Sequence, residues 1–492
     1  MEQLNDILSE ISSLLWGYPM IVLLLGTHVF LTIRLRFPQK YIFKAIRLSV
    51  SKDKESSGEV SQFAALTTAL AATIGTGNIV GVGTAIALGG PGAVFWCWLT
   101  GIFGMSTKYG EALLAVRYRI KTPQGEMRGG PMYALERGLA LHATGLRRRL
   151  WQFLALAFAA FTAVATFGIG STVQANAIST MSTDTFGFSP IVVGGVLTIL
   201  AAAVIMGGVK SIARCCQAIV PVMAGLYVAG CLVILFLNRE FILPALQLIM
   251  ESAFNPSAAG GGFIGASFII AARYGIARGL FSNESGLGSA PIVAAAAQTK
   301  NPVRQALVSS TGTFWDTVVI CAITGIVVVS SIIAYPDISM TDGSVLTKMS
   351  FSKIPYIGEP ILVFGSLTFA FSTILGWNYY GERGMEYLVT KLLYRQRRSG
   401  KAVSRSDTEL KIRKTINTYR ILFLITVYLG AVVSLDIVWN LADIFNALMA
   451  IPNLLSLLFL SQVIVSETRK YLWEGNIDEC SRQAHSSTKK AG

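Results

Sequence analysis

The sequence predicts an all-α integral membrane protein with eleven transmembrane helices, and three observations lead to this fold class. Hydrophobic residues make up 53% of the 492 residues and charged residues only 14%, whereas about a quarter of the residues of a soluble protein are charged. Apolar stretches of about 20 residues, the length that crosses a bilayer, recur along the whole chain. The connections between them alternate between strongly basic and nearly uncharged.

The apolar stretches are taken as membrane spans in contact with lipid. The first is preceded by Glu2, Asp6 and Glu10 and lacks the basic start and small-residue cleavage site of a signal peptide, so we keep it as a transmembrane helix. Several others are rich in Gly, Ala, Ser and Thr, which suits close packing between helices. The predicted spans lie near residues 16–35, 64–89, 92–116, 151–178, 189–207, 216–237, 262–288, 308–333, 360–390, 420–436 and 439–465.

Basic residues predict the orientation of these spans. Segments 36–54, 117–149 and 391–420 carry six, eight and ten Lys or Arg residues, whereas 179–188 carries none and 238–261 carries one. With eleven spans, the three basic segments face the same side. The positive-inside rule then puts the N-terminus outside and a C-terminal tail, residues 467–492, in the cytoplasm. The net charge of +14 therefore reflects membrane topology, and we expect no nucleic-acid partner. The six scattered cysteines indicate neither a disulfide framework nor a metal cluster.

Two predicted spans are expected to be broken helices. Segments 71–83 and 273–288 each place four glycines within about fourteen residues, and each glycine costs about 1 kcal/mol relative to alanine inside a helix. Close helix packing is the alternative role for such glycines. With an extra first helix (1–55) set aside, the two segments open two five-span blocks of opposite orientation, 56–240 and 241–466. Paired broken helices in inverted halves indicate the central binding site of a transporter.

The chemistry of a broken helix favours a zwitterionic ligand. Unwound backbone in mid-membrane persists only where it is buried in protein or lines a cavity. Its free N–H groups, beside a positive helix N-terminus, can hold a carboxylate, and its free C=O groups can hold Na⁺ or an ammonium group. Residues 71–83 contain no charged side chain, so the backbone itself would recognise an amino acid here.

Four longer motifs are similar to a known family. Residues 73–82, 89–96, 278–284 and 375–382 resemble the alanine/glycine:cation symporters of bacteria and archaea, and the resemblance extends over nearly all of residues 10–470. It implies the leucine-transporter type of fold, a 5+5 inverted repeat with one extra N-terminal helix, in the bacterial plasma (inner) membrane. It also implies symport of small neutral amino acids, such as alanine or glycine, with Na⁺. Ser285 departs from the family pattern, which has Ala there.

The resemblance implies a set of substrate-binding residues. The backbone N–H groups of Thr76 and Gly77 would hold the carboxylate, with Asn78 nearby. Phe167 and Gln174 share one helix face, although an amide at such a position equally well contacts another helix. Trp377 would close over a small side chain, or else anchor the helix at the membrane interface. The predicted substrate-binding residues are Thr76, Gly77, Asn78, Phe167, Gln174, Gly275, Ile276, Gly279 and Trp377.

By analogy with the same fold, a sodium site would combine two hydroxyl groups, those of Ser372 and Thr373, with the carbonyl groups of Ala71, Ile74 and Phe369. Five uncharged oxygens suit a monovalent ion, whereas Ca²⁺ would favour carboxylates. The alternative is that the hydroxyls only bond to their own helix. No cofactor other than this coupling ion is expected.

Charged residues within spans are functional candidates, and we assign those of this chain to gates: Asp316, Arg278, Glu284, Glu382 and Arg383. A channel filter, a nucleophile or metal constellation of an enzyme, and a signalling domain are absent from the sequence. Proton coupling within the same fold stays open, as does glutamine or another small amino acid as the main substrate.

Overall fold

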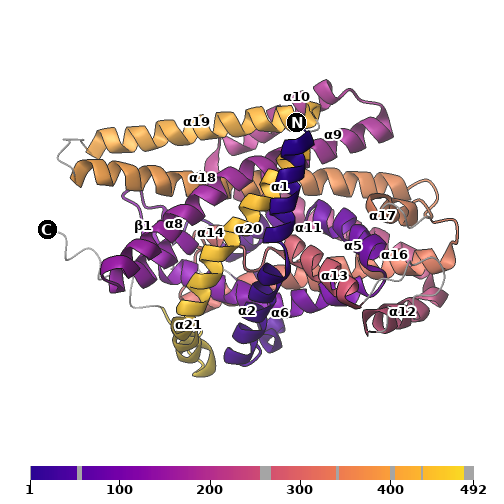
Figure 1. Ribbon diagram of the computed structural model, residues 1–492, viewed down its shortest axis with the longest axis horizontal. Coiled ribbons are helices and arrows are strands. Elements are labelled where there is room, and N and C mark those ends of the chain that lie inside the picture. Colours follow the sequence, from indigo (N-terminus) through magenta and orange to yellow (C-terminus); the bar gives the residue numbers. More distant parts are fainter. Residues whose placement is uncertain are drawn as a thin grey trace.

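The computed structural model describes residues 2–51, 58–254, 268–338, 343–398, 405–433 and 436–480 (Figure 1). These residues are almost entirely helical. Within the described part, the only paired strands are β1 (Ile120–Lys121) and β2 (Met127–Arg128), which run antiparallel with Ile120 opposite Arg128. The predicted domain boundary at residue 55, residues 262–267 of the seventh predicted span and residues 481–492 of the tail lie outside the described residues.

The predicted span near 64–89 is interrupted after α4 (Gln62–Thr73). The predicted span near 151–178 continues from α8 (Gly145–Ala165) through a π-helical turn, η5 (Thr166–Thr172), into α9 (Val173–Phe186). Both spans belong to the N-terminal half of the chain. Its elements are α1 (Glu2–Leu15), α2 (Tyr18–Arg34), η1 (Pro38–Tyr41), α3 (Ile42–Ser49), α4 (Gln62–Thr73), η2 (Gly77–Gly81), α5 (Val82–Gly89), α6 (Ala93–Arg117), α7 (Pro131–Tyr133), η3 (Ala134–Leu139), η4 (Ala140–His142), α8 (Gly145–Ala165), η5 (Thr166–Thr172), α9 (Val173–Phe186), α10 (Pro190–Ile205), α11 (Gly208–Leu237), η6 (Arg239–Phe241) and α12 (Ile242–Phe254).

The C-terminal half contains the 41-residue helix α18, and the long helix α19 lies beside it (Figure 1). Its elements are α13 (Phe268–Asn283), α14 (Pro291–Ala294), α15 (Pro302–Thr313), η8 (Phe314–Cys321), α16 (Ala322–Ala334), α17 (Gly343–Phe351), α18 (Gly358–Arg398), α19 (Arg405–Val432), α20 (Asp436–Phe459), α21 (Ser461–Thr468) and η9 (Arg469–Trp473).

Seven helices of the described residues are long and apolar enough to cross a membrane, or eight if the bent pair α4 and η2–α5 forms one span. The three remaining predicted spans correspond to α6, α10 and α13. Helix α10 has 16 residues, α6 carries Lys108 and Glu111 in its middle, and the start of the span containing α13 lies outside the described part. The chain is thus a multi-pass helical membrane protein, and the count of eleven stays a prediction.

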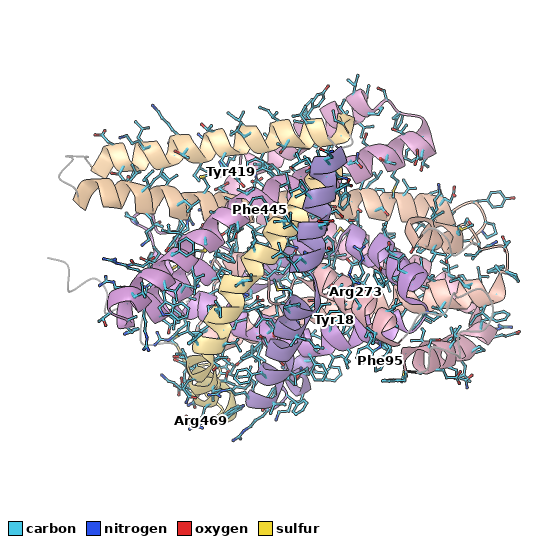
Figure 2. All side chains as sticks on the ribbon, viewed as in Figure 1. Tyr18, Phe95, Arg273, Tyr419, Phe445 and Arg469 are labelled. Atoms are coloured by element: carbon cyan, nitrogen blue, oxygen red, sulfur yellow. The ribbon has the colours of Figure 1, made fainter. Side chains whose placement is uncertain are left out.

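The surface and the interior differ as a lipid environment requires. Large apolar side chains are exposed along the outer helices, among them Ile191 and Ile199 of α10 and Phe236 of α11, and side chains project outward all around the bundle (Figure 2). The interior instead buries many hydroxyl, amide and charged groups, such as Asn78 and Asp316. Apolar side chains outside and satisfied polar groups inside are expected where lipid is the solvent.

The two predicted broken segments lie in the interior of the bundle. Helix α6 packs against both α13 and α15, and α11 packs against α4 and α18. Helix α8 packs against α18 and α20, and α1 lies along α20, in front of the bundle in Figure 1. This packing surrounds the ends of α4 and α13 with helices, so the backbone freed at those ends must find partners inside the protein.

Candidate functional site

The first break lies at Ile74 and Gly75. Helix α4 ends at Thr73, Ile74 has an extended backbone (ψ 101°), and the helix resumes at an angle of 55° to α4. The side chain of Asn78 stabilises the turn, because its Oδ1 accepts a hydrogen bond from the N–H of Gly75 (2.9 Å). At Gly75, a Cβ atom would lie 3.0 Å from the hydroxyl oxygen of Thr373, so glycine lets the turn approach α18 this closely without displacing that side chain.

Asn78 also ties this turn to a buried acid. Its Nδ2 donates hydrogen bonds to the Oδ1 (2.8 Å) and to the backbone carbonyl (3.2 Å) of Asp316 in η8. The other carboxylate oxygen of Asp316 accepts from the hydroxyl of Ser282, at the end of α13 (3.0 Å), and from that of Thr317 (2.6 Å). One carboxylate therefore bonds to side chains from both broken segments.

The second break follows α13 and lies at the C-terminal end of the segment predicted to be broken. Helix α13 ends at Asn283, and Glu284, Gly286 and Gly288 have positive φ angles of 52°, 95° and 84°, which glycine adopts without strain. Oε1 of Glu111 in α6 accepts hydrogen bonds from the N–H groups of Gly286 and Gly288, each 3.0 Å long. A buried carboxylate thus satisfies the backbone where α13 stops.

The other two glycines of the second segment are helical and serve packing. A Cβ atom at Gly275 would collide with the carbonyl of Ala93, and one at Gly279 with the hydroxyl of Thr100. Both glycines let α13 approach α6 closely, which is the alternative role that glycine has in a span. The break predicted over the whole segment is confined to its last residues.

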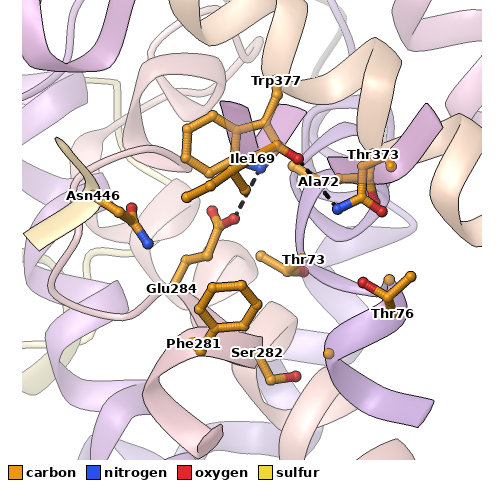
Figure 3. A pocket seen from close by; sticks show the side chains of 13 residues that line it. Ala72, Thr73, Thr76, Ile169, Phe281, Ser282, Glu284, Thr373, Trp377 and Asn446 are labelled. Carbon is orange, nitrogen blue, oxygen red and sulfur yellow. Dashed lines mark hydrogen bonds between the residues drawn. The ribbon is translucent and has the colours of Figure 1, made fainter. Parts of the chain in front are cut away.

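A small cavity lies between the two breaks, and it has room for about one or two particles of the size of a water molecule (Figure 3). Residues from α4, η5, α9, α13, α18 and α20 meet there, although they are far apart in the sequence. Its walls combine backbone, apolar rings, hydroxyls, amides and a single charged group, Glu284. The lining residues are Ala72, Thr73, Gly75, Thr76, Gly77, Ile169, Gln174, Phe281, Ser282, Glu284, Thr373, Trp377 and Asn446.

Four of the predicted substrate-binding residues line this cavity: Thr76, Gly77, Gln174 and Trp377. The amide of Gln174 donates to the carbonyl of Ile169 (3.2 Å), while its Oε1 has no hydrogen-bond partner among the described residues. That oxygen is an acceptor left over inside the site.

Five predicted substrate-binding residues are not part of the lining. Asn78 bonds Gly75 and Asp316 instead. The ring of Phe167 packs against Tyr419 and Phe423 of α19, with centroid distances of 5.0 and 6.3 Å. Ile276 is buried in α13. Gly275 and Gly279 face α6.

Several lining residues were not predicted as ligands, and those with side chains of most interest are Phe281, Ser282, Glu284 and Asn446. The sequence alone assigns Glu284 to a gate, yet its carboxylate lies in the cavity wall, where Oε1 accepts from the indole N–H of Trp377 (3.1 Å; dashed in Figure 3). The hydroxyl of Ser289 donates to the other oxygen. Asn446 could have been found as a polar side chain within an apolar run, and Glu284 as a charged residue in a predicted span.

Four of the five predicted cation ligands, all except Ile74, lie within hydrogen-bond distance of one another beside the cavity. The hydroxyl of Ser372 lies 3.2 Å from the carbonyl oxygen of Ala71 and 2.9 Å from that of Phe369. The hydroxyl of Thr373 lies 3.0 Å from each of these two oxygens. The hydroxyls therefore bond to their own helix, as the alternative held, but they also reach across to α4. Uncharged hydroxyl and carbonyl oxygens at this spacing are chemically suited to Na⁺.

Two of the predicted gating charges, Glu382 and Arg383, belong to a network of ion pairs. Arg128 pairs with Glu386 of α18 (2.8 Å) and with Glu59 before α4 (3.3 Å). Glu382 pairs with Arg383 (3.1 Å) and with Arg420 of α19 (2.8 Å). The network joins the β1–β2 loop, the start of α4, α18 and α19. Arg278 lies elsewhere, partly exposed on α13 near Gly81.

A family profile described as the sodium:alanine symporter family matches residues 1–484. The chain belongs to the sodium:alanine symporter family. The predicted family is therefore confirmed, and the family's members are transporters that work by symport, which is not an enzyme activity.

Relatives of known name support the assignment. The sodium/alanine symporter AgcS of Methanococcus maripaludis is 48% identical over 470 residues, which cover 95% of this chain and 97% of that protein. GlnT of Bacillus subtilis, named a probable sodium/glutamine symporter, is 35% identical and is covered over 91% of its length, against 95% of this chain. Among solved structures, a Na⁺-coupled sialic acid symporter in an outward-open state matches with a TM-score of 0.52 and 12% identity, over 85% of this chain and 82% of that chain. This last likeness shows a shared transporter fold alone.

Replacing Asn78 tests the role of its side chain in the first break. Asn78→Ala removes hydrogen bonds to Gly75 and Asp316 and leaves buried groups unpaired, so we expect a loss of about 1–3 kcal/mol in stability and weaker substrate binding. Thermal unfolding of the purified protein measures the first effect. Asn476→Ala, which removes a single exposed hydrogen bond, is the control, and equal unfolding midpoints for the two variants would contradict this role.

Proposed function

We propose that this symporter takes up small neutral amino acids, such as alanine or glycine, together with Na⁺ by alternating access. The observation that carries the proposal is the meeting of two helix breaks at one cavity, directly beside the hydroxyl and carbonyl oxygens of α4 and α18. The printed name of AgcS supports alanine as a substrate. That of GlnT supports glutamine as the alternative.

The proposed transport cycle rests on the predicted topology. Eleven spans, with the N-terminus outside, form the two inverted blocks 56–240 and 241–466 after the extra helix, and the termini of α4 and α13 lie at the interface of these blocks. The network around Arg128 and Glu382 would then lie on the cytoplasmic side. There it would hold the inner ends of α4, α18 and α19 together until the substrate is released.

The substrate is proposed to bind with its carboxylate on the backbone N–H groups of Thr76 and Gly77. These groups begin a helix, where the positive end of the helix dipole favours an anion. No Lys or Arg lines the cavity. A carboxylate bound there would be recognised by backbone alone, and Trp377 and Phe281 would leave room for a small side chain.

The ammonium group is proposed to face Glu284. Its carboxylate is the single charged group in the lining, and it is 4% exposed. The indole N–H of Trp377 donates a hydrogen bond to one carboxylate oxygen, and the hydroxyl of Ser289 donates to the other. Each oxygen can accept a second hydrogen bond. Glu284 would therefore complete the recognition of a zwitterion whose other end lies on the first break.

Proton coupling is the second candidate, and the buried carboxyl groups of Glu284 and Asp316 are what favours it. Both lie at the breaks, where a change of protonation would alter the contacts of the substrate site. The coupling ion is decided by transport measurements.

Thr373→Ala tests the sodium site. Uptake of labelled alanine into proteoliposomes should depend on an inward sodium gradient, and Thr373→Ala should raise the sodium concentration needed for half-maximal uptake about tenfold or more, since it removes one of few ligands. Thr368→Ala is the matched control, because the Thr368 hydroxyl bonds only to its own helix. Uptake that does not depend on the sodium gradient and is lost without a pH gradient would instead establish proton coupling.

Gly77→Val tests the carboxylate site. A Cβ atom at Gly77 would lie 3.5 Å from Phe281 and 3.6 Å from Ser282, an ordinary contact, so the fold tolerates it while the branched side chain fills the cavity. We expect a large loss of alanine binding with normal membrane insertion, a milder effect of Thr76→Val, and poor binding of alaninamide to the wild type. Gly195→Val is the control, because a Cβ atom at Gly195 of α10 would meet no other atom within 4 Å. Equal affinity for alanine and alaninamide would place the carboxylate elsewhere.

Glu284→Gln tests recognition of the ammonium group. Removing a charge-assisted hydrogen bond of about 1.5–3 kcal/mol should weaken alanine binding about tenfold or more, measured by calorimetry at saturating sodium. Lactate, which has a hydroxyl in place of the ammonium group, should bind poorly to the wild type, and its affinity should change little in Glu284→Gln. Glu240→Gln, at an exposed site, serves as the control. Unchanged alanine affinity in Glu284→Gln would show that the ammonium group lies elsewhere.

A further inference from the structure

A second, smaller cavity lies beside the first and shares Thr73 with it. Its other polar lining residues are Lys108 of α6, Asn283 at the end of α13 and Ser309 of α15, and the rest of its wall is small or apolar. The cavity has room for a single particle of about the size of a water molecule. It therefore touches both broken segments without being part of the proposed amino-acid site.

Lys108 is a buried cation whose ammonium group has no hydrogen-bond partner among the described residues. Its side chain is 3% exposed, and its Nζ makes neither a hydrogen bond nor a salt bridge within the described part. The buried carboxylates of Glu111, Glu284 and Asp316 interact with its charge through space. The N–H groups of Lys108 are therefore unused donors, and leaving buried donors without an acceptor is unfavourable.

Asn283 supplies a second unused donor. Its Oδ1 accepts a hydrogen bond from the N–H of Ser285 (2.9 Å), which fixes the orientation of the amide. The Nδ2 group is consequently the free end, and within the described part of the chain it has no partner although the residue is 1% exposed. The hydroxyl of Ser309 accepts from Gln305 (3.2 Å) and so has its hydrogen to donate.

The buried acids nearby have donors of their own. Oε1 of Glu111 accepts from Gly286 and Gly288 as well as from Asn453. Glu284 and Asp316 likewise accept from hydroxyl, indole and amide donors. None of the three acids lines the second cavity. Oε2 of Glu111 has no hydrogen-bond partner among the described residues, but this residue is not in the lining. The lining thus offers unused hydrogen-bond donors and a positive charge, which favours an anion over a metal cation as its ligand.

We propose that the second cavity binds a small monovalent anion such as chloride, held by Lys108 Nζ, Asn283 Nδ2 and the hydroxyl of Ser309. The anion joins α6, α15 and the end of α13 next to Thr73, the last residue before the first break. Its binding stabilises the arrangement of both breaks and thereby favours alanine binding. A coupling of the usual size between two sites changes affinity by about 5-fold or more.

The test compares sodium chloride with sodium gluconate at equal sodium concentration. In the wild type without amino acid, chloride should raise the thermal unfolding midpoint in a saturable manner, because it binds the folded state. Bromide in its place should give an anomalous scattering peak between Lys108 and Asn283. In proteoliposomes, alanine uptake should be at least about fivefold slower in gluconate.

Two variants and one control make the test specific. Lys108→Met should abolish the chloride response, and Ser309→Ala, a smaller change, should raise the chloride concentration needed for half of the thermal shift. Lys353→Met removes a lysine that pairs with Asp337 at the surface (2.7 Å) and should respond to chloride like the wild type.

Equal unfolding midpoints in chloride and gluconate, with no bromide peak, would show that a water molecule fills the cavity and would overturn the proposal. A full chloride response in both Lys108→Met and Ser309→Ala would overturn it as well. The thermal and scattering measurements use no amino acid. Their failure is therefore distinct from a failure of the proposed sodium-coupled uptake, which would appear as absent alanine transport in chloride.

Discussion

The structure depends on one constraint, namely that backbone freed from a helix inside an apolar bundle must be given hydrogen-bond partners. The side chains that meet this requirement come from elsewhere in the bundle or from just beyond the break. Asn78 accepts from Gly75 at the first break, and Glu111 of α6 accepts from Gly286 and Gly288 at the second. Several buried amide and carboxylate groups therefore lie where helices stop, which is also where the cavity lies.

The same polar groups make the two breaks a single unit. Asp316 receives hydrogen bonds from Asn78, which belongs to the first break, and from Ser282, which precedes the second. Neither break can shift relative to η8 without leaving a buried carboxylate short of a donor, and such a loss costs about 1–3 kcal/mol or more for a charged group. A rearrangement that opens the cavity is accordingly expected to move both helix ends together.

The sequence was sufficient to predict a helical membrane protein of many spans and the first break, because four glycines around an asparagine, Asn78, strongly favour an unwound turn in an apolar span. It was not sufficient for the second. The sequence does not distinguish a glycine that adopts a positive φ angle, such as Gly286, from one that permits close helix packing, such as Gly279. A shift of a few residues in the predicted position of the break changes which face of α13 is expected to line the cavity. For this reason Phe281 and Glu284 were not predicted as lining residues.

On the proposed function, the cation and substrate sites are coupled by their adjacency along the chain. The carbonyl of Ala71 belongs to the last turn of α4, and the N–H groups proposed to hold the carboxylate follow it by only a few residues. Between them lies Gly75, where a Cβ atom would come within 3.0 Å of the Thr373 hydroxyl. A cation that draws Ala71 and Thr373 to itself would fix the end of α4 against α18 and thereby orient those N–H groups. Linkage makes the effect reciprocal, so a bound carboxylate would hold the cation ligands in place, as symport requires.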